Sequence, residues 1–202
     1  MTRKLVVFPI VHTPQDMGSL RSSISTGHTR DVEEFTRDFW LRLVGMITKI
    51  VSHIDPIHLQ IYQDGLPVGG ELGEAIIRES AESGSANHRL ILSLLKKGAT
   101  LEATESPSLL KQEYEIIKMI YSETNGQKRA QLEERYQIQL KSIAEDRDRK
   151  IAENINASLK QGNFGFLFIG AAHFVNPFLS SDISVFTNDG DSEHILRWLS
   201  AT

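Results

Sequence analysis

The sequence contains no cysteine. This absence excludes disulfide bonds, zinc sites built from thiolates and a cysteine nucleophile. Any catalysis by this chain must therefore use oxygen groups or the imidazole of histidine.

A stripe of basic residues is absent as well. The 22 lysines and arginines are scattered among 26 acidic residues, and the formal net charge is −4. Binding to the phosphate backbone of nucleic acid needs a concentrated positive surface. We therefore expect no nucleic-acid partner.

The N-terminus lacks a long hydrophobic run. The stretch "MTRKLVVFPIVHTPQD" has about seven apolar residues before His12, which is too few for the core of a secretory signal and for a bilayer span. We expect a cytoplasmic protein with no membrane partner.

What remains is the composition of an ordinary globular protein, with 40% hydrophobic and 24% charged residues over 202 positions. No repeat, low-complexity tract or interdomain linker is present. This length suits one domain with a sizeable core, so residues 1–202 are expected to form a single domain.

Short runs rich in β-formers alternate with helical patterns along the chain. The predicted strands are residues 5–11, 57–62, 100–104, 164–170 and 183–187. The predicted helices are residues 32–50, 74–83, 87–97, 107–161 and 194–199, with a break in the fourth at "SETNGQ". This alternation predicts an α/β fold with a mostly parallel central sheet flanked by helices.

The helical segment 107–161 is long for its place before the last strands, and we expect it to project from the domain. It carries an apolar stripe at Leu132, Tyr136, Leu140 and Ile143. A projecting stripe of this kind can be buried against a second subunit. A homodimer through the long helices is therefore one hypothesis.

Polar residues follow four of the predicted strands. They are His12, Asp64, Glu105 and His173. In a parallel sheet, ligands bind outside the carboxyl ends of the strands, so these four residues can share one edge. Two have simpler interpretations: Glu105 can favour the start of the helix near Pro107, and Asp64 is a natural turn residue.

Arg147 interrupts an apolar helical stripe that continues at Ile151 and Ile155, so it should face the sheet. The helix from Gly162 back to Arg147 and the strand from Phe164 to His173 have comparable lengths. If the helix packs antiparallel to the strand, the guanidinium of Arg147 lies near the imidazole of His173. The alternative is a structural ion pair with Asp148 or Glu145.

Imidazole and carboxylate together can hold a divalent metal, or can act as a general base with its orienting partner. An arginine suits an oxyanion, a carboxylate or a phosphate. The small residues Gly170, Ala171 and Ala172 leave room for a ligand to approach the backbone beside His173.

The segment "RDRKIAENINASLKQGNFGFLFIGAAHF" resembles the C-terminal signature of the TraB/Tiki group, within the erythromycin-esterase/ChaN-like superfamily. In that group an arginine-bearing helix precedes a strand that ends in Gly-x-x-His, here Gly170 to His173. A second such motif corresponds to "PIVH" at Pro9 to His12. The resemblance implies an α/β fold and metal-dependent hydrolysis of peptide or ester bonds, and it assigns catalytic roles to His12, Arg147 and His173.

The sequence departs from that pattern at two positions. Pro9 replaces the glycine of the first motif, and Gln60 stands nearest to the position of the family's glutamate. A glutamine cannot supply the charge that a metal needs, so either Asp64 or Glu105 substitutes or the site does not turn over substrate.

Three functions follow as hypotheses. The first is a hydrolase in which His12, His173, Glu105 and Asp64 bind Mn, Co or Zn, and Arg147, Gly170, Ala171 and Gln60 contact a small-molecule or peptide substrate. The second is a non-catalytic module in which the same, degenerate site binds a small anion and reports it to a partner. The third is a structural subunit that uses its long helices.

Overall fold

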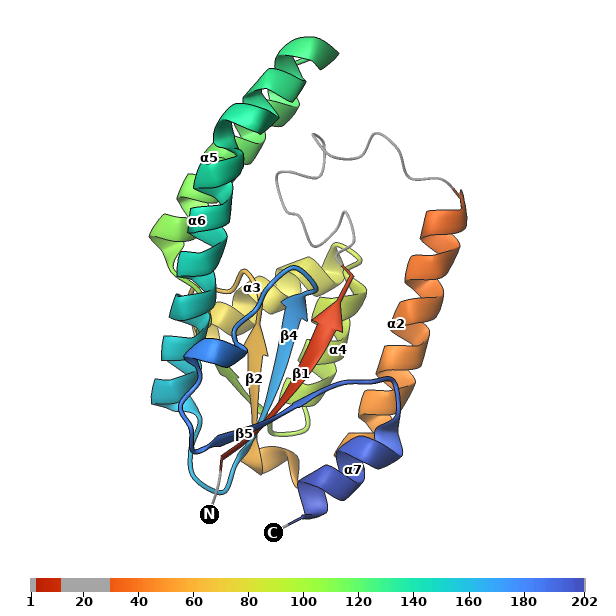
Figure 1. Ribbon diagram of the computed structural model, residues 1–202. Helices are drawn as coiled ribbons and strands as arrows, with labels where there is room; N and C mark the ends of the chain where they lie inside the picture. The colour runs from red at the N-terminus through yellow and green to blue at the C-terminus, as the bar shows by residue number, and fades with distance from the viewer. Residues whose placement is uncertain (1–2, 12–29, 202) are drawn as a thin grey trace.

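The computed structural model describes residues 3–11 and 30–201. Five strands form one sheet in the order β3-β2-β4-β1-β5, and every neighbouring pair is parallel (Figure 1). The strands are β1 (Arg3–Ile10), β2 (Leu59–Gln63), β3 (Thr100–Glu102), β4 (Phe164–Gly170) and β5 (Ile183–Thr187). The predicted α/β fold is confirmed.

The central strand β4 reads "FGFLFIG", and its last six residues are buried. A strand covered on both faces needs such a continuous apolar run, whereas a half-solvated strand would alternate. In the register of the sheet, Gly170 lies opposite Ile10 of β1, and Phe168 lies opposite Gln63 of β2. The carboxyl ends of the three inner strands therefore reach the same edge.

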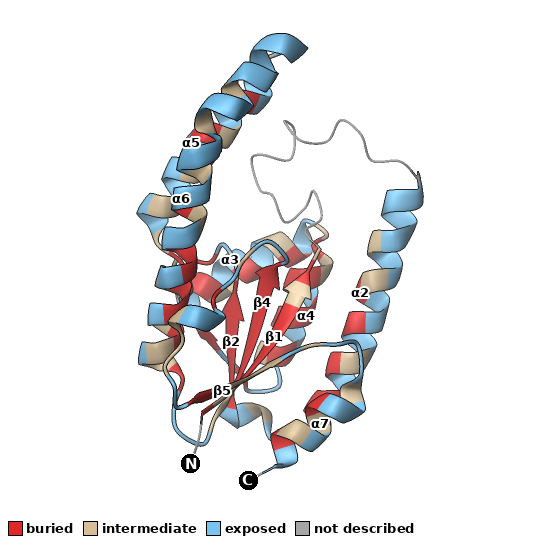
Figure 2. Ribbon diagram, in the orientation of Figure 1, coloured by how far each residue is buried: buried red, intermediate tan, exposed pale blue. Residues whose placement is uncertain are grey.

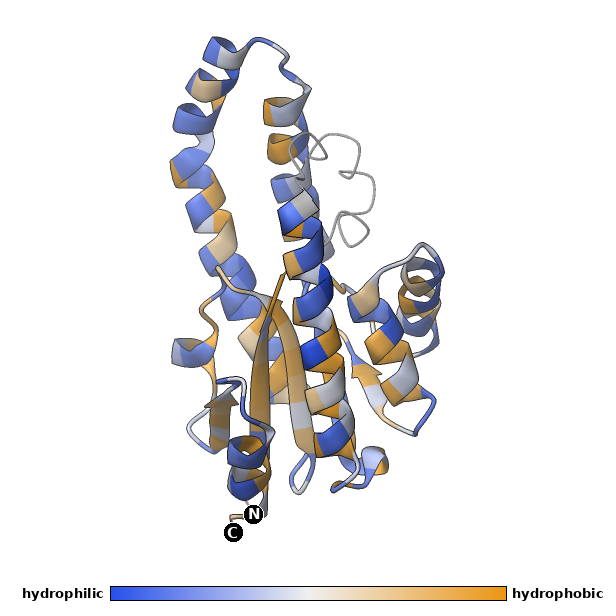
Figure 3. Cartoon of the chain, turned by 90° about the vertical axis from the view of Figure 1, so that its right-hand side faces the viewer, coloured by the Kyte–Doolittle hydropathy of each residue, from blue (hydrophilic) through white to orange (hydrophobic). Residues whose placement is uncertain are grey.

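Two hydrophobic layers enclose the sheet. On one face lie α2 (Arg30–Val51), α3 (Gly70–Glu82), α4 (Ala86–Leu95) and α7 (Ser192–Ser200). The second half of α6 (Gly126–Ser158) covers the other face, where Ile151 and Ile155 pack on Leu167 and Ile169. Figure 3 shows the apolar residues concentrated in and next to the strands.

The helices α5 (Pro107–Ser122) and α6 form an antiparallel hairpin that extends past the carboxyl edge of the sheet (Figure 1). At the turn, Asn125 caps α6 by accepting hydrogen bonds from the backbone of Gln127 and Lys128. This turn lies within the predicted break, and the predicted long insertion is confirmed. The end of the hairpin is mostly exposed (Figure 2).

The apolar stripe of α6 is used inside the hairpin. Leu132, Tyr136, Leu140 and Ile143 pack together with Ile116 and Ile120 of α5. We expected this stripe to be available to a second subunit, but α5 already covers part of it. A homodimer through the long helices stays a prediction.

A close approach at Gly69 sets the position of the segment after β3. A Cβ atom there would lie 2.7 Å from the carbonyl oxygen of Leu101 and 2.9 Å from the backbone nitrogen of Ala103. Glycine thus lets the start of α3 lie against the end of β3. The two residues that follow, Thr104 and Glu105, each donate a backbone N–H to the carbonyl of Leu66.

Within the described part of the chain, every helix is too short or too polar to cross a membrane.

Candidate functional site

The edge formed by the carboxyl ends of the strands gathers three of the residues expected there. Asp64 follows β2 directly, Glu105 comes three residues after β3, and His173 comes three residues after the end of β4. The fourth, His12, lies outside the described residues. Ile10, two residues earlier in the chain, pairs with Gly170 of β4.

Asp64 is fixed to the end of β4 by two hydrogen bonds. Its backbone N–H donates to the carbonyl of Phe168 at 2.9 Å, and its Oδ2 accepts from the backbone N–H of Gly170 at 3.0 Å. The side chain is only 6% exposed. The carboxylate is therefore held at one place on the sheet edge.

His173 is oriented by Asp148 of α6. The Nδ1 atom lies 2.5 Å from Oδ1 of Asp148, whose Oδ2 accepts the backbone N–H of Phe174 at 2.9 Å. An ionised carboxylate only accepts hydrogen bonds, so the proton of this contact sits on Nδ1. In the neutral ring, Nε2 then carries a lone pair, and it lies 3.6 Å from Oδ2 of Asp64.

Arg147 is buried among three carboxylates from three other segments. Its Nη2 lies 2.8 Å from Asp64 and 2.6 Å from Glu105, and its Nη1 lies 2.7 Å from Glu113 of α5. Burial lowers the pKa of Arg147, but the hydrogen bond that it donates to Glu105 and the three nearby negative charges outweigh this effect and hold the pKa above the ordinary value. The guanidinium stays charged and works as a common counter-ion.

Glu105 is the most deeply enclosed of these acids, with no exposed side-chain surface. Burial raises its pKa, while the hydrogen bond and charge of Arg147 oppose the shift. Its Oε1 receives both contacts from Arg147, whereas Oε2 is buried and has no hydrogen-bond partner in the described part of the chain. An orphaned buried oxygen of this kind requires an explanation, because it loses its hydration without replacement.

The cluster carries an excess of negative charge. Four carboxylates, those of Asp64, Glu105, Glu113 and Asp148, surround one guanidinium and one imidazole. Even with Glu105 protonated, three carboxylates remain for one permanent positive charge. Such a balance favours a cation over an anion at this edge.

The small residues beside His173 lie as expected. Ala171 and Ala172 are exposed in the turn between β4 and His173, and Gly170 contacts Asp64 through its backbone. Arg147 and His173 come together, as the counting along helix and strand predicts, because both contact Asp64.

Gln60 is not brought to this edge. It lies near the start of β2, opposite Gly165 at the start of β4. Its side chain is buried and joins the end of α6 to the sheet, donating to Glu102 and to the carbonyl of Ser158 and accepting from the backbone N–H of Lys160. A glutamine with these bonds is already satisfied at the opposite end of the sheet.

Two residues of the cluster were missed as site residues by the sequence analysis. Asp148 was considered only as an ion-pair partner of Arg147, yet it binds His173. Its spacing to Ile151 and Ile155 places it on the buried side of α6, and this was the available signal. Glu113 similarly precedes the buried Ile116 and Ile120 at helical spacing.

No group of three or more His, Asp or Glu side chains in the described residues is arranged to hold a metal ion. Comparison of the chain with family models, with curated proteins and with solved structures gives no match.

Proposed function

We propose that this protein is a metal-dependent hydrolase of the TraB/Tiki type, acting on a peptide or ester bond. His173 and Asp64 would hold a divalent metal such as Mn, Co or Zn, and His12 would be a further ligand. The observation that carries the proposal is the separation of 3.6 Å between Nε2 of His173 and Oδ2 of Asp64.

This separation is slightly longer than that of two ligands of one ion, so a small movement of either side chain would suffice. Nitrogen and oxygen ligands lie about 2.0–2.2 Å from zinc, which puts two of them roughly 3.0–3.5 Å apart in tetrahedral or octahedral arrangements. In a neutral His173 with its proton on Nδ1, the lone pair of Nε2 faces the carboxylate of Asp64. Two acceptors that face each other in this way support a cation as the missing partner.

The surroundings of the pair support the proposal. Histidine ligands usually donate a hydrogen bond from the N–H of the second ring nitrogen to a carboxylate, and here Asp148 accepts from Nδ1 of His173. Asp64 is held in turn by the backbone of Gly170 and by Arg147. Both ligands are therefore oriented before an ion arrives.

The contacts of Arg147 also favour this function over the anion-binding alternative. All three donor nitrogens of Arg147 already contact carboxylates, namely those of Glu105, Glu113 and Asp64. A small anion would have to compete with these carboxylates. We assign Arg147 to positioning Asp64 and Glu105, and a direct contact with substrate stays a prediction.

A bound divalent metal supplies a Lewis acid that polarises a carbonyl and makes bound water more acidic. The residues of the chain orient the two ligands. Asp148 keeps the proton of His173 on Nδ1, and Gly170 and Arg147 hold the carboxylate of Asp64 toward the imidazole. Ala171 and Ala172 are exposed and add no bulky side chain to the turn before His173.

The test is calorimetric titration of the full chain with Mn²⁺, Co²⁺ and Zn²⁺, for the wild type, for His173→Ala and for the control His58→Ala. His58 is an exposed histidine next to β2, away from the cluster. We expect one strong site in the wild type and in His58→Ala, and its loss in His173→Ala with an unchanged circular dichroism spectrum.

Hydrolysis of a chromogenic ester and of a peptide library, with and without the bound metal, then tests turnover. Full metal binding by His173→Ala would overturn the site. Tight binding with no metal-dependent hydrolysis of any substrate would leave a metal-binding module and refute the enzyme.

A further inference from the structure

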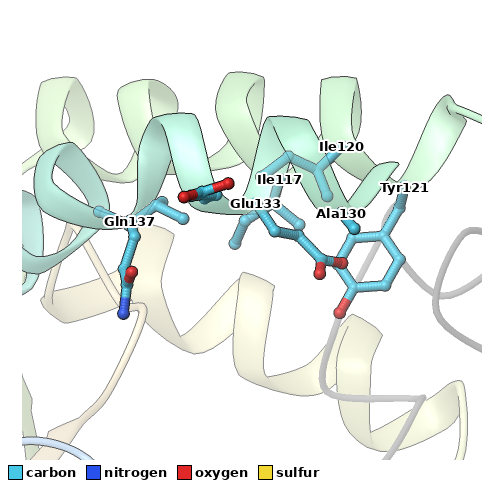
Figure 4. Close-up of a pocket in the computed structure, with 8 residues that line it drawn as sticks. Ile117, Ile120, Tyr121, Ala130, Glu133 and Gln137 are labelled. Carbon is cyan, nitrogen blue, oxygen red and sulfur yellow. The ribbon is translucent and has the colours of Figure 1, made fainter. Parts of the chain in front are cut away.

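A second candidate site lies in the hairpin, away from the sheet edge. Between α5 and α6, toward the end of the hairpin, there is a hollow of about 600 Å³ (Figure 4). Ile120 and Leu140 form part of its apolar wall. This volume is within the range of small-molecule sites, which are typically about 300–1,000 Å³.

The sequence of α6 explains why this space stays open. Along the hollow, α6 presents the small Ala130, then Glu133 and Glu134, and reaches a large apolar residue only at Leu140. The carboxylates cannot be buried against Ile120 without losing their hydration. Leu132 and Tyr136 pack toward Ile116 and Ile120 of α5. The groove runs beside this contact, on the side where α6 presents Ala130, Glu133 and Glu134.

The polar groups of the groove are acidic and aromatic. Glu133 has one ion-pair partner, Arg129 of the preceding turn, at 3.9 Å and largely in solvent. Glu134 has no hydrogen-bond or ion-pair partner within the described residues. Tyr121 is 42% exposed, and its ring lies on the same side of the hairpin as Glu133 in Figure 4.

These features define the chemistry of an occupant. Carboxylates next to the face of an aromatic ring attract an ammonium group, by charge and by the cation–π interaction. The aliphatic wall takes an apolar body, and no lysine or arginine lines the groove. We propose that the groove binds a small amphipathic amine, a protonated amino group carried on an aliphatic or aromatic body.

This site is separate from the proposed hydrolase site. None of the residues that line the groove contacts Arg147, Asp64 or His173, although Glu113 of the cluster lies on α5 one turn before Ile117. The two proposals can therefore fail independently.

The test is calorimetric titration of the full chain with octylammonium, octanoate and octanol, which share one chain length and differ in charge. We expect saturable binding of octylammonium at one site and no binding of octanoate. The double variant Glu133→Gln/Glu134→Gln should lose about tenfold in affinity, because two partly exposed charge pairs are removed.

Glu145→Gln, an exposed acid on the same helix outside the groove, is the matched control and should bind as the wild type does. Tyr121→Leu keeps the apolar wall and removes the aromatic ring, so it should also weaken the binding of octylammonium. Equal binding of octylammonium and octanoate, or an unchanged double variant, would overturn the proposal. Tighter binding of a basic amphipathic peptide than of octylammonium would also refute a small amine as the occupant.

Discussion

Arg147 and Asp64 are 83 residues apart in the chain, and their side chains meet at 2.8 Å. The same guanidinium binds Glu105, in the segment after β3, and Glu113 of α5. One side chain of α6 thus ties the sheet edge to the base of the hairpin. Its loss should affect stability more than the loss of any exposed arginine.

Replacing Arg147 with methionine keeps much of the volume and removes the charge. The carboxylates of Asp64 and Glu105 would then be buried without a counter-ion, and breaking a buried pair in this way costs roughly 3–5 kcal/mol. We expect the free energy of unfolding, measured by urea denaturation, to fall by about this amount. Lys141→Met, at an exposed position on the same helix, should change it by less than about 0.5 kcal/mol. A loss for Arg147→Met as small as that of the control would show that the cluster adds little to stability.

Asp148→Asn tests the orientation of His173. Asparagine keeps the size of the side chain but cannot accept from Nδ1 and from Phe174 N–H with a full negative charge. If His173 is a metal ligand, metal affinity should fall by about 10- to 100-fold, the usual effect of removing such a partner. Titration calorimetry measures this effect, and Asp146→Asn, an exposed neighbour on α6, is the control. Equal losses in both variants would point to a general effect of charge and not to the contact with His173.

The pair of Arg3 and Asp182 predicts a pH dependence of stability. Nε of Arg3 lies 2.8 Å from Oδ2 of Asp182, and this hydrogen bond holds the pKa of the Asp182 carboxyl below its ordinary value. A lowered pKa in the folded state stabilises the fold above the unfolded pKa of about 3.9, and the contribution is lost as the pH falls below it. Thermal unfolding can be measured between pH 6 and pH 3, in steps of about half a pH unit. The melting temperature should fall less steeply with decreasing pH for Asp182→Asn than for the wild type. Parallel curves would mean that the pair contributes nothing.

Much of the fold could be read from local patterns. The predicted strands 164–170 and 183–187 coincide with β4 and β5. For β4 the reason is plain, because a buried apolar run that follows a glycine turn has few other interpretations. The first residues of the helices were harder to predict from the sequence. The chain begins α3 at Gly70, four residues before the predicted start, because the approach of Gly69 to β3 is a tertiary contact.

Most of the predictable part of the site came from one rule, the meeting of strand ends at one edge. This rule found Asp64, Glu105 and His173, and counting along α6 and β4 added Arg147. It could not find Asp148 or Glu113, since the partner of a helical acid depends on which element packs against that helix. It also gave no reason to separate Gln60 from Asp64, although the two lie toward opposite ends of the same strand and serve different parts of the molecule.

The hydrogen bond from Gly170 to Asp64 joins residues that are 106 positions apart, and it closes only when β4 has entered the sheet beside β2. A nascent or partly unfolded chain therefore has the side chains of the cluster but not their arrangement. Any ion that recognises this arrangement binds the finished molecule alone, so its binding free energy adds directly to the resistance of the native chain to unfolding.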